Sequence, residues 1–332
     1  MNSLEHILSN DIEINSLTSL NNYSDAARLL IKKQLREWKQ LKDGFESLES
    51  AKFKTFGFGN FKIKFQFNPK RIISSSAKID AESIKERKCF LCIQNLPSNQ
   101  RAILYKNEFI ILGNPFPIFP EHFTIASINH VPQSIENSFI DLLHLSKDLA
   151  KHYTVFYNGP KCGASAPDHL HFQAGTKYFM PIDDEFDILK NEFGRSLVED
   201  NNILVYSIDD GLRKFISFES KNMELLSKRF SQLFKILKKD KQEEPMMNIL
   251  SFYKDSFGWR VLVFLRAKHR PHHYNEKSDK KILWSPAAVD LGGVCITPLE
   301  RDFNNITKKI INEVFAEIMI PAEELNVIGK NL

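Results

Sequence analysis

The most informative segment of this chain is Asp168-His169-Leu170-His171-Phe172-Gln173-Ala174. A β-strand sends alternate side chains to opposite faces. His169, His171 and Gln173 then line one face, and the apolar residues between them pack behind it. Three polar groups in a row on an apolar backing predict a chemically active strand face. The alternative is an ordinary strand with two histidines on its polar side.

The loop before this strand strengthens the prediction. It runs Asn158-Gly-Pro-Lys-Cys-Gly-Ala-Ser165 and contains small residues, a hydroxyl and an ammonium group. Backbone amides in such a turn can bind a phosphate. A glycine-rich turn alone is weak evidence, but directly before a histidine pair it predicts one site. The expected phosphate contacts are Asn158, Lys161, Gly163 and Ser165, with Cys162 a small space-filler.

The surrounding pattern alternates short strands with helices. Strands are expected at 102–105, 109–112, 123–128, 154–157 and 169–177, a proline-stiffened loop at 114–122 and a helix at 134–152. A similar order follows, with strands near 203–208, 213–218, 246–253, 259–266 and 293–297 and helices at 222–238 and 302–317. The repetition predicts a distant internal duplication without detectable sequence identity.

The first 85 residues have their own pattern. Ser24 and Asp25 predict a helix start, and apolar residues recur at helical spacing to about Ser50, which predicts one long helix. The apolar period then becomes two over 61–67, which is typical of a half-buried strand. Residues 74–88 are polar and are expected to form a connector.

Composition excludes several classes of protein. The chain has 332 residues, 45 Lys+Arg against 41 Asp+Glu and a net charge of +4, too slight to indicate nucleic-acid binding. Its 27 Phe, 8 Tyr and 3 Trp argue against disorder. The longest clean apolar run, 261–265, is strand-sized, and four cysteines are too few for a disulfide scaffold. The first residues lack a basic segment typical of a secretion signal, so a cytoplasmic globular protein is expected.

The segments GASAPDHLHFQ (163–173) and PFPIFPEHFTIASINHVPQ (115–133) resemble the histidine-triad superfamily. The resemblance is to its branch of galactose-1-phosphate uridylyltransferases, diadenosine tetraphosphate phosphorylases and GDP-hexose phosphorylases. It is clear over 89–175. Over 203–317 it rests on the order of elements and on SPAAVDLGGVCITPLERDF (285–303).

This resemblance implies an α+β, HIT-like fold with two HIT-like halves around antiparallel sheets. Residues 1–85 lie outside the resemblance, and their own pattern predicts an N-terminal extension of a long helix and a β-hairpin. By the resemblance, residues 86–180 would form the catalytic half. Residues 181–332 would form a second, catalytically silent half. Val261, Val263 and Leu265 would stand where a second histidine set would lie.

The resemblance also implies covalent catalysis by His171, the second histidine of the motif. A neutral imidazole would attack the α-phosphorus of a nucleotide and form a nucleotidyl-histidine. With an ordinary pKa near ~6.5, histidine is largely neutral in the cytoplasm. Gln173 can donate a hydrogen bond to a phosphate oxygen but cannot protonate a leaving group or activate water. It therefore favours transfer to phosphate or sugar phosphate over hydrolysis.

A metal site is expected from the pair Cys89 and Cys92. Alone, the pair is a redox pair, half of a zinc site or two buried thiols. The uridylyltransferase resemblance implies that His130 and His169 complete a structural zinc site. His122 is a rival ligand, but it and His130 bracket one expected strand, roughly 26 Å apart, so both cannot bind one ion.

Three further residues are candidate substrate contacts. His122 either bonds near the nucleoside or supports the proline-rich loop. Arg266 and Lys268 begin a basic run, 266–273, which is by default a solvated loop and alternatively a phosphate or sugar contact.

The function expected is a nucleotidyltransferase or phosphorylase acting on a nucleoside diphosphate sugar, GDP-hexose-like, or on a dinucleoside polyphosphate. Inorganic phosphate or a sugar phosphate would be the acceptor. The alternatives are a hexose-1-phosphate uridylyltransferase-like enzyme and a non-catalytic nucleotide sensor; a zinc-stabilised RNA-binding protein is disfavoured by the low net charge. The nucleobase, the sugar, the acceptor and the oligomeric state stay open.

Overall fold

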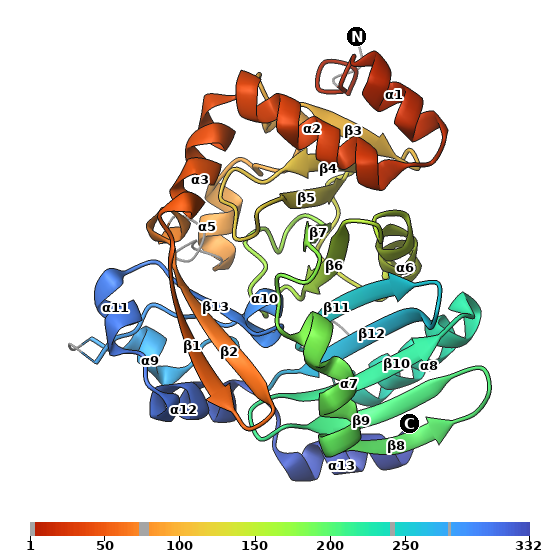
Figure 1. The fold of residues 1–332 in the computed structure, drawn as a ribbon, viewed down its shortest axis with the longest axis vertical. Helices are drawn as coiled ribbons and strands as arrows, with labels where there is room; N and C mark the ends of the chain where they lie inside the picture. The colour runs from red at the N-terminus through yellow and green to blue at the C-terminus, as the bar shows by residue number, and fades with distance from the viewer. Residues whose placement is uncertain (1–3, 73–79, 240–242, 278–279) are drawn as a thin grey trace.

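A ten-stranded antiparallel sheet forms the centre of the computed structural model, which describes residues 4–72, 80–239, 243–277 and 280–332 (Figure 1). The first half contributes five strands and a helix. They are β3 (Ala102–Tyr105), β4 (Phe109–Gly113), β5 (His122–Ser127), α6 (Phe139–Asp148), β6 (Tyr153–Asn158) and β7 (His171–Thr176). The strands expected at 102–105 and 109–112 pair as the hairpin β3–β4, with Lys106 and Asn107 at positive φ in its turn.

The second half repeats this arrangement. Its elements are β8 (Gly194–Glu199), β9 (Leu204–Asp209), β10 (Lys214–Ser220), α8 (Met223–Leu237), β11 (Met247–Lys254) and β12 (Gly258–Leu265). The spatial order β3-β4-β5-β7-β6 is mirrored by β11-β12-β10-β9-β8. The halves join where β6 pairs with β11, for example at Phe156 and Leu250. The expected duplication therefore appears in the topology, within one continuous sheet.

One face of this sheet is covered by helices. They are α2 (Tyr23–Glu37), α6, α8 and α13 (Ala322–Asn331), which bury a core that includes Leu30, Leu142, Phe172 and Val263. The helix α1 (Ile12–Ser19) packs on α2. The other face carries α7 (Ile182–Phe193) and a second core that includes Phe156 and Leu262. The helix α7 and strand β8 had no counterpart among the expected elements.

A small three-stranded sheet lies over that second face and pairs an N-terminal hairpin with a strand from the C-terminal part of the chain. The expected N-terminal hairpin is β1 (Lys52–Phe58) and β2 (Phe61–Phe67), and β13 (Val294–Thr297) pairs in parallel with β2. The short helices nearby are η1 (Pro69–Arg71), α5 (Ala81–Glu86), η2 (Ile93–Asn95), α9 (His272–Asn275) and α10 (Ala288–Leu291). Residues 74–79 of the expected connector lie outside the described residues.

Two expected helices are each split in two. The N-terminal one is α2 and α3 (Lys39–Glu49), separated at Trp38, whose side chain is buried and whose backbone is extended. The break lets α3 approach the proline-rich loop so closely that a Cβ on Gly44 would lie 2.2 Å from the Pro115 carbonyl oxygen. The C-terminal one is α11 (Glu300–Asn305) and α12 (Lys308–Ile318), the latter capped by Thr307.

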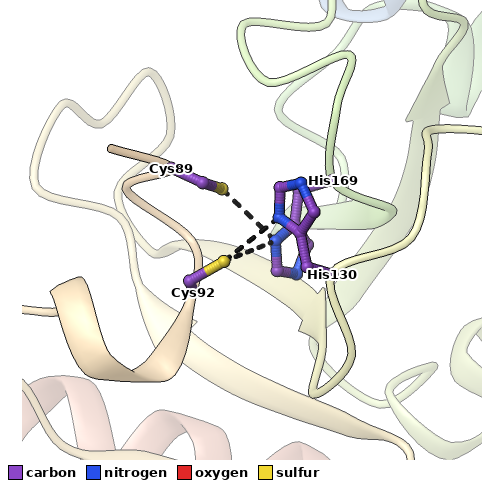
Figure 2. A group of neighbouring side chains, drawn as sticks. All are labelled: Cys89, Cys92, His130 and His169. Atoms are coloured by element: carbon purple, nitrogen blue, oxygen red, sulfur yellow. Dashed lines mark hydrogen bonds between the residues drawn. The ribbon is translucent and has the colours of Figure 1, made fainter. Parts of the chain in front are cut away.

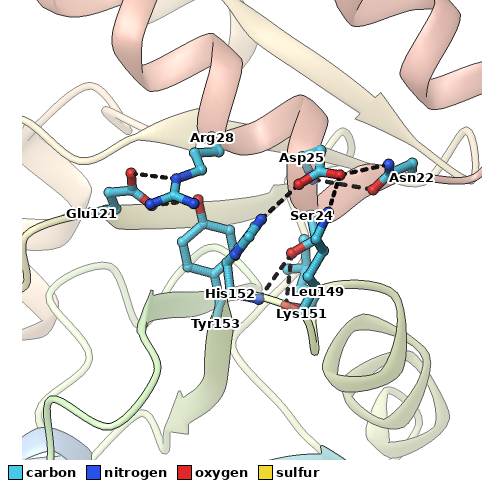
Figure 3. Close-up of polar contacts among 9 residues, drawn as sticks. All are labelled: Asn22, Ser24, Asp25, Arg28, Glu121, Leu149, Lys151, His152 and Tyr153. Carbon is cyan, nitrogen blue, oxygen red and sulfur yellow. Dashed lines mark hydrogen bonds and ion pairs between the residues drawn. The ribbon is translucent and has the colours of Figure 1, made fainter.

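Polar contacts fix α2 to the first half of the large sheet (Figure 3). The Asp25 carboxylate accepts hydrogen bonds from Lys151 Nζ and His152 Nε2, both at 2.6 Å. Glu121 pairs with Arg28 at 3.1 Å and accepts a hydrogen bond from the Tyr153 hydroxyl at 2.7 Å. Since Glu121 directly precedes β5, these bonds hold the start of the strand that carries His122.

The described strands of the second half, β8 to β12, carry no histidine, but the positions expected to match the histidine set were wrong by one residue. Gln173 pairs with Phe156, Phe156 with Leu250 and Leu250 with Leu262, and residues paired across a sheet share a face. The matching positions of β12 are therefore Arg260, Leu262 and Phe264. Val261, Val263 and Leu265 point to the helix-covered face.

None of the described helices has the length and apolar character needed to cross a membrane.

Candidate active site

The His171 imidazole is held with one nitrogen toward a cavity. The side chain is buried, and its Nδ1 lies 2.8 Å from the His169 carbonyl oxygen. A carbonyl only accepts hydrogen bonds, so Nδ1 carries the proton and Nε2 keeps its lone pair. Burial lowers the pKa of His171 to about 4, so the ring is neutral at pH 7. This is the protonation state that a nucleophilic imidazole requires.

Gln173 lines the same cavity, and His122 fixes the orientation of its amide. The backbone N–H of Ile118 donates to His122 Nδ1 at 3.1 Å, so the ring proton is on Nε2. That Nε2–H donates to Gln173 Oε1 at 3.1 Å. The Gln173 oxygen is thereby committed, and its NH₂ group is the part left for a ligand. Burial lowers the pKa of His122 to about 3, which keeps this arrangement neutral.

The expected phosphate loop is largely where the motif placed it. Asn158, Gly163 and Ser165 line the cavity beside His171. Gln133 Nε2 donates to the carbonyl oxygens of both Asn158 and His171, at 2.9 and 3.0 Å, and so joins the loop to β7. Lys161 is not among the described residues that line the cavity; its ammonium pairs with Glu243 at 2.7 Å. Cys162 is fully buried, in keeping with a space-filler.

The cavity has a volume of about 430 Å³ and runs across the sheet in both directions from Gln173. Toward β4 it is bordered by Leu112 and by the mainly apolar residues Trp38, Leu96, Pro97, Pro115 and Phe116. Toward the second half its wall includes Arg71, His269, Arg270, Ser285 and Asp290. Asp290 is the one carboxylate against two arginines among the described lining residues, which suits an anionic ligand. Of these five, His269 and Arg270 belong to the basic run 266–273, whereas Arg71, Ser285 and Asp290 were not named as candidate contacts from the sequence.

Two expected substrate contacts lie elsewhere. Arg266 is buried and donates to four backbone carbonyls and to Asn248 Oδ1, and the described cavity lining does not include it. Lys268 pairs with Glu317 at the surface. The basic run does reach the cavity, through its next two residues, His269 and Arg270.

Four side chains that could bind a metal ion meet beside the start of β7 (Figure 2). The ligand atoms of Cys89, Cys92, His130 and His169 all lie within 4.8 Å of one another. Cys89 Sγ is 3.3 Å and Cys92 Sγ is 3.7 Å from His169 Nδ1, and Cys92 Sγ is 3.1 Å from His130 Nδ1. His122 is not part of this group, so the preference for His130 over His122 agrees with the structure.

This donor set fits zinc. A tetrahedral ion with Zn–S near 2.3 Å and Zn–N near 2.0–2.1 Å needs sulfur–nitrogen separations of about 3.6 Å, close to those present. His169 Nε2–H donates to the Ser127 carbonyl at 2.8 Å, which leaves the Nδ1 lone pair free to bind metal. β7 begins at His171, so His169 lies in the turn before the strand. It belongs to the metal cluster and does not line the cavity, contrary to the expectation of one shared face.

Comparisons with known proteins agree with this architecture. Residues 30–176 match the family model "Domain of unknown function (DUF4922)", and residues 190–331 match "GDPGP1-like, C-terminal domain". A galactose-1-phosphate uridylyltransferase from Staphylococcus saprophyticus is 32% identical over 149 residues, 40% of this chain and 30% of that protein. The chain thus spans under a third of this curated relative.

Solved structures show the same fold. Yeast Ap4A phosphorylase Apa2 in complex with AMP superposes with a TM-score of 0.59 at 17% identity, covering 89% of this chain and 96% of the yeast chain. Its complex with Ap4A gives 0.54 at 16% identity, covering 85% and 97%. The likeness confirms the α+β, HIT-like fold. With the two family models, each of which covers less than half of the chain, and the curated relative, it supports the resemblance to the histidine-triad-like branch of galactose-1-phosphate uridylyltransferases and Ap4A phosphorylases.

Proposed function

We propose that this protein transfers a nucleotidyl group from a nucleoside diphosphate sugar or a dinucleoside polyphosphate to inorganic phosphate. The observation that carries the proposal is the neutral His171 imidazole, whose Nε2 lone pair faces a cavity also lined by the amides of Gln173 and Asn158. A nucleophile between hydrogen-bond donors is the arrangement that attack at a phosphate needs.

The reaction follows from these groups in two steps. His171 Nε2 attacks the α-phosphorus, a P–N bond forms, and the P–O bond to the second phosphate breaks. The leaving group departs as a phosphate ester or anhydride, which needs no proton from Gln173. An oxygen of inorganic phosphate then attacks the same phosphorus and breaks the P–N bond, which restores His171 and releases a nucleoside diphosphate.

The shape of the cavity supports a nucleotide as the bound group. From Gln173, the β5 partner is Thr124 and the β4 partner of Thr124 is Leu112, so the apolar side near Trp38 begins about 10 Å from the reacting centre. That side suits a nucleobase and ribose. The opposite side, with Arg71 and Arg270, suits the leaving or accepting phosphate.

We further propose that Cys89, Cys92, His130 and His169 hold a structural zinc ion. Four protein ligands close the coordination sphere and leave no position for substrate. The His169 carbonyl oxygen accepts a hydrogen bond from His171 Nδ1–H. A metal ion that anchors His169 would therefore orient the His171 imidazole. Catalysis itself uses His171 and the amides around it.

The direct test is a substrate panel. The purified protein is incubated with GDP-glucose, UDP-glucose or diadenosine tetraphosphate, each with inorganic phosphate or galactose 1-phosphate, and products are identified by mass spectrometry. We expect a nucleoside diphosphate from at least one donor with phosphate. Without acceptor, a base-quenched sample should carry a nucleotidyl adduct on His171, because phosphorus–nitrogen bonds hydrolyse in acid.

His171→Ala is the matched variant. It should lose turnover and the adduct while keeping the far-UV spectrum and the unfolding midpoint near those of the wild type. Activity close to wild type would exclude the covalent step. Turnover with galactose 1-phosphate alone would favour the hexose-1-phosphate uridylyltransferase alternative, which the aligned curated relative supports. Tight nucleotide binding without turnover would favour a sensor.

A further inference from the structure

Arg266 is the centre of a buried hydrogen-bond network in the second half. It follows β12, and its side chain is 4% exposed. Its guanidinium donates to backbone carbonyls of Pro286, Lys268, His269 and Ile318, at 2.8 to 3.3 Å, and to Asn248 Oδ1 at 2.7 Å. Through these carbonyls the guanidinium holds backbone segments next to the cavity wall. The remaining acceptor, Asn248, is a side chain on β11.

Asn248 passes this constraint to the catalytic half. Because its Oδ1 accepts from Arg266, its Nδ2 must donate. Nδ2 donates to Asn158 Oδ1 at 2.8 Å and to the Cys162 carbonyl at 2.6 Å. Asn248 is fully buried and pairs with Asn158 across the β6–β11 boundary. The hydrogen bonds therefore cross from one half to the other.

The consequence is a fixed direction for the Asn158 amide. Its Oδ1 accepts from Asn248 and also from the Ala288 backbone N–H at 2.9 Å. Both lone pairs of the oxygen are used, so the NH₂ group is the part available to the cavity that Asn158 lines. Gln173 is held in the same way by His122. Two amide donors with committed oxygens thus stand near His171.

We infer that Arg266 and Asn248 are positioning residues for nucleotidyl transfer, acting through Asn158. They hold its NH₂ group toward a non-bridging oxygen of the α-phosphate, where negative charge is stabilised as His171 attacks. The inference rests on the proposed function. It gives the second half, expected to be catalytically silent, a direct part in building the site. Arg266 does so without touching the substrate.

The most informative variant is Asn248→Asp. It keeps an oxygen that can accept from Arg266 but replaces the Nδ2 donor with a second oxygen. Two acceptor oxygens repel each other, so Asn158 Oδ1 cannot stay in contact with this position. The Asn158 amide should turn over and present its oxygen to the phosphate. We expect kcat/KM to fall about 100-fold, the effect of losing one donor at a developing oxyanion. Asn248→Ala, which only releases Asn158, should fall less.

The matched control is Arg260→Lys. Arg260, on β12, is likewise buried, but its guanidinium bonds Glu219 and Asp187, and it is not among the described residues that line the cavity. Comparing unfolding midpoints of the variants separates lost stability from lost positioning.

A second pair of variants tests Arg266 itself. Arg266→Lys keeps a positive charge and a hydrogen-bond donor at position 266, and it should lose less activity than Arg266→Met.

The decisive readout does not depend on the amount of folded enzyme. We would measure the rate ratio for the two phosphorus diastereomers of the α-thio analogue of the donor that the wild type accepts. An amide that bonds one non-bridging oxygen makes the two diastereomers unequal. The ratio should move in both Asn248 variants and stay at the wild-type value in Arg260→Lys. An unchanged ratio in Asn248→Asp overturns the inference.

A binding measurement keeps the test separate from the proposed function. Calorimetry with AMP, GMP and UMP against adenosine, guanosine and uridine gives the part of the affinity due to the phosphate. In Asn248→Asp, the part of the affinity that is due to the phosphate should fall at least tenfold, whereas the affinity for the nucleoside should change little. This is expected even if the wild type turns over no donor in the panel. A wild type that turns over no donor refutes the proposed function alone. A phosphate contribution equal in wild type and Asn248→Asp, or absent from the wild type, refutes the inference.

Discussion

Gly163 should be the most sensitive position of the phosphate loop. Its φ is +97°, and a Cβ there would lie 2.6 Å from Ala287 Cβ, about 0.8 Å short of the 3.4 Å at which ordinary contact begins. Gly163→Ala therefore adds backbone strain of about 1–2 kcal/mol and overpacking of about 1–3 kcal/mol. Relief requires the loop and the 287 wall to separate by nearly an ångström, and both border the cavity.

Gly211 provides the matched control. Its φ is +86°, but a Cβ would meet nothing within 4 Å. Gly211→Ala should lose about 1–2 kcal/mol of unfolding free energy in urea titrations and keep its kcat/KM. Gly163→Ala should lose about 2–5 kcal/mol and about 10- to 100-fold in kcat/KM for phosphorolysis, because displacements of this size misalign reacting groups. Equal kcat/KM values in the two variants would refute the placement of the phosphate at this loop.

Three further predictions concern the acceptor, the metal and pH. Gln173→His adds a proton shuttle and should raise the ratio of nucleoside monophosphate to diphosphate released in the presence of phosphate; a wild type that already releases mainly monophosphate would contradict the transferase argument. Metal analysis should find about one zinc per chain, and a metal-free protein with reduced thiols would exclude the site. Cys89→Ser should mainly lower the unfolding midpoint and have a smaller effect on kcat. Burial raises the pKa of Glu244 from 4.5 to about 6, so between these values the folded protein holds a proton that the unfolded chain has released. Its free energy of unfolding should fall as pH rises through that window, by at most about 2 kcal/mol, and Glu244→Gln should remove that fall in urea titrations.

The first half of the large sheet was predictable from the sequence because its signals are local. His171 and Gln173 are two residues apart on one strand and share a face, and the hairpin before them has its own turn residues. The four side chains of the candidate metal site could be named only through family resemblance. Cys89 and His169 lie 80 residues apart, and nothing in the spacing alone brings them together.

The second half was harder to predict because β12 is buried along its whole length. A strand buried on both faces has no polar alternation, so its phase cannot be inferred from the sequence. That is why Val261 and Val263 were assigned to the wrong face. Arg266 shows the complementary problem. An arginine in a basic run resembles a surface contact, and only tertiary packing reveals that neutral carbonyls surround its guanidinium.

The mirrored strand order of the large sheet bears on how the protein distinguishes the two ends of its substrate. The arrangement is that of two like units related by a pseudo-twofold axis at the β6–β11 pair, covalently joined into one chain. Two identical units would present the His171 imidazole twice. Here one unit carries His171, while the matching face of β12 offers Leu262 and Phe264. Internal symmetry has been broken in the side chains and kept in the backbone. A donor with chemically equal ends, such as a dinucleoside polyphosphate, would therefore be cleaved at one end per binding event, and which end reacts is decided when the donor enters the cavity.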